Sequence, residues 1–329
     1  MPYADTNGTG VTFRTWAPNA SAVGVKGQFN GWATTPMVKE GSTPYWSVDI
    51  PGAQTGQEYK YRINNSVDRR DPRSRRVSNS AGNSIIYNRN AFDWSGHSFT
   101  TPWYNDLVIY QMHPGTYNAE AWIPSSFDTN IERLDHLKEL GVSAIKVMPV
   151  NEFAADKSWG YNPADVFAIE SSLGGPDAFK RFVKAAHERG IAVLVDVVHN
   201  HYGPSDLSLW QFDGWSQNNL GGIYFYNEPA KAYTWWGDTR PDFGRAEVRQ
   251  FIRDQIFMFL EEYKVDGFRW DSVFNILYYN GGANSLPDGE AMLRDINWEM
   301  GQSFPGKIRI AEDHAFDKSM NFDSMWEVS

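Results

Sequence analysis

The residues with the clearest chemical potential end a short apolar stretch, Val265-Asp-Gly-Phe-Arg-Trp-Asp271. This stretch follows a long amphipathic helical pattern and is predicted to be a buried β-strand. Because side chains alternate along a strand, Arg269 and Asp271 should lie on the same side. An opposite charge favours an ionised carboxylate, so Arg269 is expected to keep Asp271 charged at neutral pH. Such a carboxylate can act as a nucleophile, and a purely structural ion pair is the alternative.

A second acid, Glu312, ends the next predicted strand. The carboxyl ends of parallel strands meet at one edge of a sheet, so we expect Asp271 and Glu312 to be neighbours. Two such groups can divide roles, one ionised and one protonated. When they are about 5–5.5 Å apart, one attacks the anomeric carbon of a sugar and the other protonates the leaving oxygen, with retention of configuration. Acids at strand ends also cap helices, and that alternative stays open.

Further polar groups end an earlier strand, in Asp196-Val-Val-His-Asn-His201. Alternation places Asp196 and Asn200 on one side and the two histidines on the other. We predict hydrogen bonds from this segment to substrate hydroxyls, with Asp196 orienting Arg269 or a histidine. The spacing matches no zinc pattern, so no metal or other cofactor is predicted. Calcium, which binds oxygen ligands, is the alternative for the carboxylate and the asparagine.

Aromatic residues make up 15% of the chain, with 14 Trp and 16 Tyr. A surplus of rings suits stacking on flat amphipathic ligands such as sugars. Tyr161, in the predicted loop Trp159-Gly-Tyr-Asn-Pro163, is a candidate for stacking beneath a sugar ring. Ordinary packing of a loop tyrosine is the alternative.

A cluster of arginines surrounds Asp71-Pro72. Basic clusters can bind an anionic partner, but they more often pair with nearby acids or lie on the surface. We expect the second arrangement here. The cluster consists of Arg69, Arg70, Arg73, Arg75 and Arg76.

The elements that must position these residues change type along the chain. Residues 8–92 contain short alternating strands separated by turn residues, as in a small sandwich. From residue 107 onward, apolar strands alternate with amphipathic helices, which predicts a parallel α/β sheet. The predicted strands are 107–110, 144–150, 191–198, 265–271 and 308–312, and the predicted helices are 131–140, 176–190, 248–263 and about 289–300.

Polar residues follow the predicted strand ends, as at the rim of a (β/α)8 TIM barrel, where active sites lie. Five strands cannot close such a barrel, so we predict a multi-domain chain with an incomplete one. Its parts would be an all-β immunoglobulin-like sandwich (1–95), a linker (96–106) and the N-terminal part of a barrel (107–329). The predicted rim residues are His113, Asn151, Asn200, His201, Asp271 and Glu312.

Composition narrows the function classes. The net charge is −10, from 30 basic and 40 acidic residues, which argues against non-specific nucleic-acid binding. The absence of cysteine excludes disulfides and thiolate chemistry. Neither a secretory signal nor an apolar run of about 18 residues is visible, so no membrane span is expected. These features favour a cytoplasmic protein.

The chain resembles the α-amylase superfamily, glycoside hydrolase family 13, in its motifs and their order. The motifs are Asp196-Val-Val-His-Asn-His201, Gly267-Phe-Arg-Trp-Asp271, Ala311-Glu312-Asp313, Met148-Pro-Val-Asn-Glu-Phe153 and Trp159-Gly-Tyr161. The N-terminal part resembles the family 48 carbohydrate-binding module, through Phe13-Arg-Thr-Trp-Ala-Pro18 and Phe29-Asn-Gly-Trp32. The run from Trp236 to Arg245 looks most like that of 1,4-α-glucan branching enzymes and close trehalose-forming relatives.

This resemblance implies specific roles. Asp271 would be the nucleophile, Glu312 the general acid and then base, and Arg269 the residue that holds Asp271. The resemblance also implies that His201 binds sugar hydroxyls, that Tyr161 stacks on the sugar, and that Asp196 supports the arginine. In the module Trp32 and Trp46 could contact glucan, and core packing is the alternative for both. The implied partners are α-glucans such as glycogen, starch or maltooligosaccharides.

The sequence departs from the family at its C-terminal end. Family members carry a third carboxylate, in a His-Asp pair after the seventh strand, and this chain ends at Ser329 before any predicted sixth strand. Losing one transition-state contact typically costs about 3–4 kcal/mol. We therefore expect the chain alone to be poorly active and to self-associate through the open edge of its sheet.

Three functions remain in competition. The first is a retaining α-glucan enzyme of branching type, present as its N-terminal portion. The second is an amylase or debranching hydrolase of the same superfamily. The third is a glucan-binding fragment without catalysis. The sequence does not distinguish transfer from hydrolysis, because acceptor-site loops set that choice.

Overall fold

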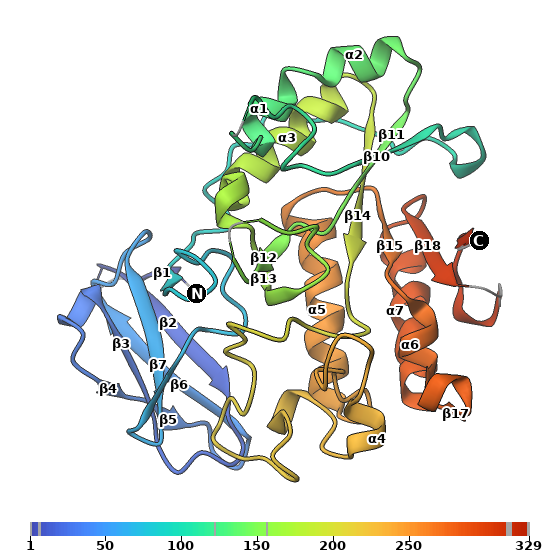
Figure 1. Cartoon of the computed structure of the whole chain (residues 1–329). Coiled ribbons are helices and arrows are strands. Elements are labelled where there is room, and N and C mark those ends of the chain that lie inside the picture. The colour runs from blue at the N-terminus through green and yellow to red at the C-terminus, as the bar shows by residue number, and fades with distance from the viewer. Residues whose placement is uncertain (1, 6–7, 122, 156, 314–317, 328–329) are drawn as a thin grey trace.

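The computed structural model describes residues 2–5, 8–121, 123–155, 157–313 and 318–327. Figure 1 shows a β-sandwich next to an open, curled parallel sheet with helices packed on its outside. The predicted combination of a sandwich and an incomplete barrel is confirmed. Within the described residues, no helix is long and apolar enough to cross a membrane.

Alternating side chains build the N-terminal sandwich. In β2, Val11 and Phe13 are buried in its core while Arg14 points outward. Tyr61 and Ile63 of β7 pack into the same core. The sheets run in the orders β1-β2-β6-β5 and β4-β3-β7-β8, with β9 paired to β7. The strands are β1 (Pro2–Asp5), β2 (Gly8–Trp16), β3 (Val23–Gly27), β4 (Thr35–Pro36), β5 (Val38–Lys39), β6 (Tyr45–Pro51), β7 (Glu58–Ile63), β8 (Val67–Arg69) and β9 (Ser84–Ile85).

The parallel sheet of the barrel carries the polar rim. Its strands are parallel neighbours in the order β10-β11-β14-β15-β18-β19. Every residue of β11, β14 and β15 is buried, as expected for a sheet covered on both faces. The strands are β10 (Ile109–Met112), β11 (Ala144–Val147), β14 (Ala192–Val197), β15 (Gly267–Trp270), β18 (Ile308–Asp313) and β19 (Ser324–Glu327).

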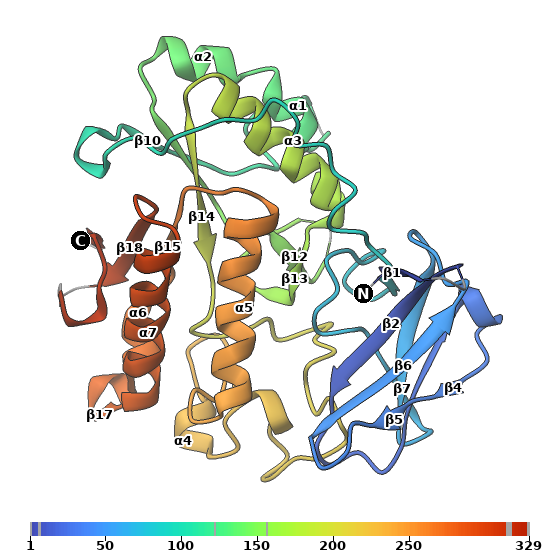
Figure 2. The same cartoon turned by 180° about the vertical axis from the view of Figure 1, so that it is seen from behind.

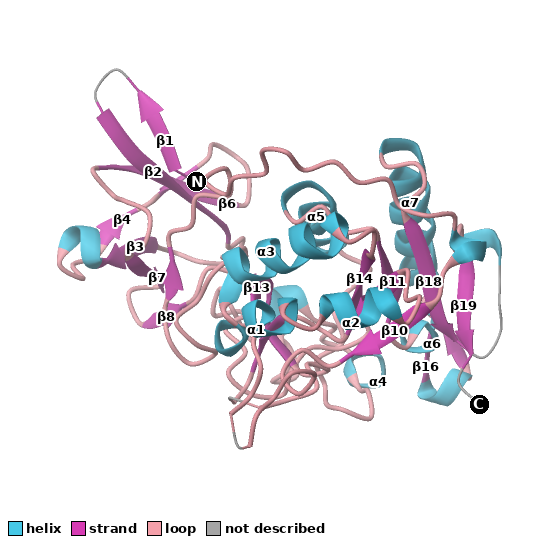
Figure 3. Cartoon of the chain, turned by 90° about the horizontal axis from the view of Figure 1, so that it is seen from above, coloured by secondary structure: helices cyan, strands magenta, loops and turns pink. Residues whose placement is uncertain are grey.

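The sheet has six strands in the described part of the chain, so the prediction of about five strands with no sixth was wrong. Seen from above in Figure 3, β19 lies at the outer end of the sheet next to β18. Sequence reading missed it because Ser324–Glu327 is short and does not alternate. The predicted interruption at the chain end also includes Val328 and Ser329, which lie outside the described residues.

Helices cover the outer face of this sheet. Figure 2 shows α5 between the sandwich and α7, and the ring of Phe259 on α5 packs against Phe268 of β15 at 6.2 Å between centroids. The helices are α1 (Phe127–Ile131), α2 (Leu134–Glu139), α3 (Gly175–Glu188), α4 (Pro229–Ala232), α5 (Ala246–Glu262), α6 (Val273–Leu277) and α7 (Pro287–Ser303).

Two local predictions were wrong. The predicted helix 131–140 is two short helices, α1 and α2. Buried Asn130 donates to the carbonyl of Pro114 at 2.8 Å, which ties the chain to the preceding loop at the break. Sequence reading also missed the hairpin of β12 (Asn151–Phe153) and β13 (Pro163–Ile169), although residues 159–162 of the predicted loop do lie in a loop, and β16 (Tyr278–Tyr279) with β17 (Asn284–Ser285) forms another hairpin. Asn151, predicted at the rim, donates to Val166 O at 2.6 Å within the first hairpin.

The arginine cluster fastens the sandwich to the barrel. Arg70 donates to both oxygens of Asp165 on β13 at 3.0 Å, and both side chains are buried. Arg75 pairs with Glu262 of α5 at 2.7 Å. The expectation that the cluster pairs with nearby acids is confirmed for these arginines and for the Arg73–Asp254 pair.

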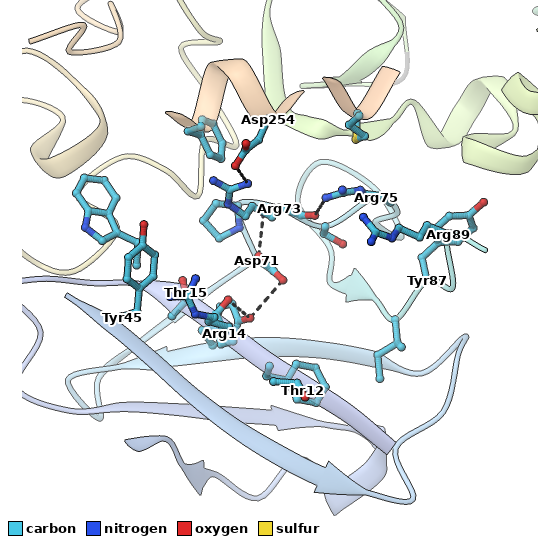
Figure 4. Close-up of a pocket in the computed structure, with 18 of the residues that line it drawn as sticks. Thr12, Arg14, Thr15, Tyr45, Asp71, Arg73, Arg75, Tyr87, Arg89 and Asp254 are labelled. Atoms are coloured by element: carbon cyan, nitrogen blue, oxygen red, sulfur yellow. Dashed lines mark hydrogen bonds and ion pairs between the residues drawn. The ribbon is translucent and has the colours of Figure 1, made fainter. Parts of the chain in front are cut away.

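A cavity of about 780 Å³ lies along this seam between the sandwich and α5. Figure 4 shows Arg73 reaching across it to Asp254, with Tyr45 and Arg14 on the sandwich side. Arg14 pairs with Glu40 at 2.9 Å. These arginines already have carboxylate partners, and none of the predicted catalytic residues lines the cavity.

We predict that Arg70→Met destabilises the protein by about 3–5 kcal/mol, because it leaves Asp165 buried without its cation. Equilibrium denaturation in urea measures this loss. The control is Arg181→Met, which breaks the half-exposed pair with Asp128 and should cost about 1 kcal/mol or less. Equal losses in the two variants would contradict the buried clamp.

Candidate active site

Strand β15 brings Asp271 to the rim through a close approach to β18. Gly267 has φ +155°, and a Cβ there would meet the carbonyl oxygen of Ile308 at 2.1 Å, so only glycine fits. Phe268 and Trp270 are buried. Arg269, which lies between them, contacts acids on or at the ends of three strands.

One guanidinium joins the predicted catalytic acids. Arg269 Nη1 lies 2.7 Å from Asp271 Oδ1 and 2.8 Å from Asp196 Oδ1. Its Nη2 pairs with Glu312 Oε1. Since Asp271 and Glu312 contact the two ends of one planar group, the structure brings them together as predicted from their strands.

The backbone between these acids is held in an unusual conformation. Ser272, directly after Asp271, has φ +42°, in the left-handed region that a non-glycine residue rarely adopts. Its N–H donates to Glu312 Oε2 at 2.7 Å. Such backbone strain costs about 1–3 kcal/mol and often accompanies functional sites. The contact also fixes Glu312 relative to Asp271.

The ionisation of Asp271 differs from the sequence-based expectation. Burial, with the negative charges of Asp196 and Glu312, raises the pKa of Asp271 to about 7, although Arg269 and Asn200 act in the opposite direction. The expected effect of Arg269, which favours the charged form of Asp271, is present but is outweighed. The sequence-based expectation was therefore incomplete. It considered one cation and neither the burial nor the neighbouring acids.

Asp196 supports Arg269 from below the rim. It is completely buried, and its Oδ2 accepts from Lys146 Nζ at 2.5 Å and from the Tyr161 hydroxyl at 2.7 Å. Because both oxygens are occupied and water is excluded, its position fits support of the arginine rather than contact with a ligand. Tyr161 also lies beneath Arg269, whose Cζ is 5.9 Å from the ring centroid.

Sequence reasoning missed Lys146. Its amine is buried, and besides Asp196 it donates to Gln111 Oε1 at 2.9 Å and faces the ring of Trp326 at 5.4 Å. Burial lowers the pKa of Lys146 while Asp196 and Asp271 act to raise it. A signal existed: Lys146 is the one charged residue in the apolar run Ala144–Val150.

The histidine motif does not divide as alternation predicted, because β14 ends at Val197 and the two histidines lie in different surroundings. Asn200 donates to Asp271 Oδ2 at 2.7 Å, and His201 Nδ1 lies 2.5 Å from Asn200 Oδ1. His201 Nε2 contacts Tyr161 O at 2.8 Å. Burial lowers the pKa of His201 to about 4, so the ring is neutral at neutral pH and donates to one of these oxygens. His199 instead contacts Gln255 at 3.1 Å, away from the acids.

The other candidates lie elsewhere. In the sandwich, Trp46 donates to Ala17 O at 3.0 Å and packs against the core, while Trp32 is exposed after a tight turn. His113 contacts Thr116 and Ser158 O. Within the described residues, no three His, Asp or Glu side chains are grouped to hold a metal ion. The glucan roles of the two tryptophans and the absence of a cofactor stay predictions.

Models of known families match both parts of the chain. The sequence model of the alpha amylase catalytic domain matches residues 126–241. The model of carbohydrate-binding module 48, the isoamylase N-terminal domain, matches residues 2–77.

Individual relatives give the same picture. A 1,4-alpha-glucan branching enzyme of Methylococcus capsulatus is 33% identical over 92% of this chain and 44% of its own length. A malto-oligosyltrehalose trehalohydrolase of Saccharolobus solfataricus is 35% identical over 82% of this chain and 45% of its own. The chain thus spans about half the length of the curated relatives it matches. A crystal structure of a pullulanase with maltotetraose, from Anoxybacillus sp. LM18-11, shares the fold (TM-score 0.76, 24% identity, 94% of this chain and 48% of that one).

We predict that Lys146→Met raises the pKa of Asp271, because removing a cation destabilises the nearby carboxylate. An upward shift of about one unit would leave roughly a tenth of Asp271 ionised at pH 7. Carboxyl ¹³C NMR of aspartate-labelled protein measures the titration, with Asp271→Asn to assign the signal.

Lys180→Met is the matched control for this titration. Lys180 is an equally buried lysine on α3, and its amine donates to Arg89 O at 3.1 Å, away from the acids. Lys146→Gln serves if the methionine variant does not fold. Identical Asp271 titrations in the Lys146 and Lys180 variants would show that Lys146 does not set this ionisation.

Proposed function

This chain belongs to the α-amylase family and carries a family 48 carbohydrate-binding module at its N-terminal end, and on that premise we propose that it acts on α-1,4 and α-1,6 glucosidic bonds of glucan chains. The observation that carries the proposal is the shared guanidinium of Arg269, which holds Asp271 and Glu312 side by side at the strand ends. A pair of neighbouring carboxyl groups is the arrangement that retaining glycosidases use.

In the proposed mechanism an oxygen of ionised Asp271 attacks the anomeric carbon. The glycosidic bond breaks as Glu312 gives its proton to the leaving oxygen, and a covalent glucosyl-enzyme forms. An incoming hydroxyl then attacks the anomeric carbon, Glu312 takes its proton, and Asp271 is released. Tyr161 would stack beneath the reacting sugar, and neutral His201 would bind its hydroxyls.

The identity of the incoming hydroxyl decides the reaction type. We favour transfer to another glucan, as in 1,4-α-glucan branching, because most of the similar curated relatives carry that name. The second candidate is hydrolysis, which the trehalohydrolase relative supports with 35% identity. The partner in both cases is an α-glucan such as glycogen, starch or a maltooligosaccharide, and a cytoplasmic location fits either.

We predict that an activated, slowly released glucosyl fluoride labels Asp271 covalently, and that mass spectrometry of the digested protein locates the sugar on that residue. Labelling needs one turnover, so it detects a weakly active chain. Since the nucleophile must be ionised, the labelling rate should fall by about tenfold for each pH unit below the pKa of Asp271 near 7.

Two variants are controls for the labelling. Asp271→Asn should remain unlabelled, and Asp254→Asn, at the seam with the sandwich, should be labelled normally. Glucan pull-down without any labelling of Asp271 would instead favour the third function, a binding fragment without catalysis.

We further predict that any turnover of amylose lowers iodine staining with few new reducing ends, because transfer conserves the number of ends. Many new reducing ends would identify the hydrolase. The expectation that the 329-residue chain is poorly active is tested in the same assay, and robust turnover would contradict it. Self-association through β10 or β19, the two outer strands of the described sheet, stays a prediction that light scattering can check.

A further inference from the structure

Two exposed tryptophans project from a rigid turn beside the candidate active site. The backbones of Thr234 and Gly237 pair with each other, with N···O distances of 2.8 and 3.2 Å. Trp235 and Trp236 are the two residues between them. The Thr234 hydroxyl donates to Gly237 O at 2.8 Å and lies 3.3 Å from the Trp236 N–H. The turn is therefore fixed by its own hydrogen bonds.

The tryptophans continue the polar rim outward. Trp236 stacks on His201, with ring centroids 4.5 Å apart and planes 15° apart. Trp235 follows at 6.3 Å, tilted by 51°. Through Asn200, His201 is connected to Asp271. The amide of Asn200 and then the rings of His201 and Trp236 thus connect the candidate nucleophile to Trp235, which is 80% exposed.

Arg240 anchors the turn to the strand end that carries Asp271. Its buried guanidinium donates to the carbonyls of Tyr233 and Tyr278 at 2.8 Å and to that of Asn275. Tyr233 precedes the turn, and the other two belong to the segment that follows Asp271. Burial lowers the pKa of Arg240 to about 10. These hydrogen bonds tie the segment before the turn to the segment after Asp271, so the turn is held in place.

Rigid, exposed indole rings are costly to leave in water and are therefore typical of a binding surface. One face of Trp236 is covered by the ring of His201. The rest of Trp236 and the largely exposed ring of Trp235 suit the apolar faces of sugar rings, while hydroxyls at the sugar edge stay in water. The indole planes of Trp235 and Trp236 are tilted by 51°, which suits a chain whose successive rings turn relative to one another.

Resting on the proposed function, we propose that Trp236 and Trp235 form a stacking track for a linear α-glucan, extending the substrate site outward from His201. Trp236 binds the glucose unit next to the one at His201, and Trp235 binds a unit farther along. The track selects long chains, because a short oligosaccharide ends before it reaches Trp235.

The test is calorimetric titration with maltooligosaccharides from maltose to maltoheptaose. For the unaltered turn, affinity should rise with chain length. Trp235→Ala should bind the long chains about tenfold more weakly, a loss of about 1.4 kcal/mol, and should bind maltose within about twofold of the parent. For Trp235→Ala, the expected signature is an affinity that hardly changes with the length of the oligosaccharide.

Two variants make this test specific. Trp298→Ala removes a tryptophan that is 60% exposed on α7, and it should leave the length dependence unchanged. All titrations use a Trp32→Asn background, so that binding by the module does not mask the track. Asparagine is chosen because Trp32 has φ +63°, a conformation that asparagine tolerates. Thermal melting confirms that each variant is folded.

The outcomes separate the two proposals. If the parent discriminates by length and Trp235→Ala does so equally well, the track is wrong while the proposed function stands. If Trp298→Ala weakens binding as much as Trp235→Ala, the effect is not specific to the turn and the track is wrong. If the parent binds no oligosaccharide but Asp271 is labelled by the activated fluoride, the track alone fails. Absence of both binding and labelling overturns both proposals.

Discussion

One cation, the guanidinium of Arg269, holds the candidate site together. It contacts Asp196, Asp271 and Glu312, which lie on or at the ends of three neighbouring strands, so it joins those strands electrostatically as well as the backbone pairing does. Removing it would leave three carboxylates facing one another at the edge of a buried sheet. Such a cluster is stable only when its charges are balanced. The amine of Lys146 supplies the second positive charge from inside the sheet.

This balance has a chemical consequence at the rim. The cluster holds three acids and two bases, and it sits where water is largely excluded. Asp271 is therefore poised between its two protonation states near neutral pH, whereas an exposed aspartate would be ionised throughout. The strained Ser272 and its hydrogen bond to Glu312 keep the second acid in place while the first changes its charge. The protonation state of Asp271 thus depends on the buried side chains of Asp196 and Arg269 as well as on the groups that would face a ligand.

Motif and periodicity predicted the parts of this arrangement that are local in sequence. Alternation along 265–271 placed Arg269 beside Asp271, and helical periodicity gave α3, α5 and α7 with small errors at their ends. Strand order also predicted that Asp271 and Glu312 are neighbours, but contacts of residues outside the motifs were beyond such reasoning. The role of Lys146 depends on Asp196, fifty residues later. Strand β19 forms because β18 offers it backbone partners, although its own four residues carry no alternating pattern. The pKa of Asp271 depends on burial, which no spacing reports.

Charge pairing also explains why the cavity at the seam is not the candidate site. Arginines that line it, such as Arg14, Arg73 and Arg75, are paired with acids from the barrel or from the sandwich itself. The site at the strand ends instead holds acids that share a single cation. Local electrostatics is therefore a better guide to chemistry in this protein than the volume of empty space.

The fastening of the sandwich to the barrel has a further consequence. Because Arg70 and Asp165 are buried together and Asn64 donates to the carbonyl of Asp213 across the seam, the two domains do not swing as if joined by a tether. A polymer bound by both domains would therefore occupy two sites at a fixed distance from each other. Binding at the second site is strengthened by effective concentration only when the polymer spans the distance between the two sites, and it is not strengthened otherwise. For a polymer bound by both domains, the fixed seam would therefore translate domain orientation into a preference for the length spanned.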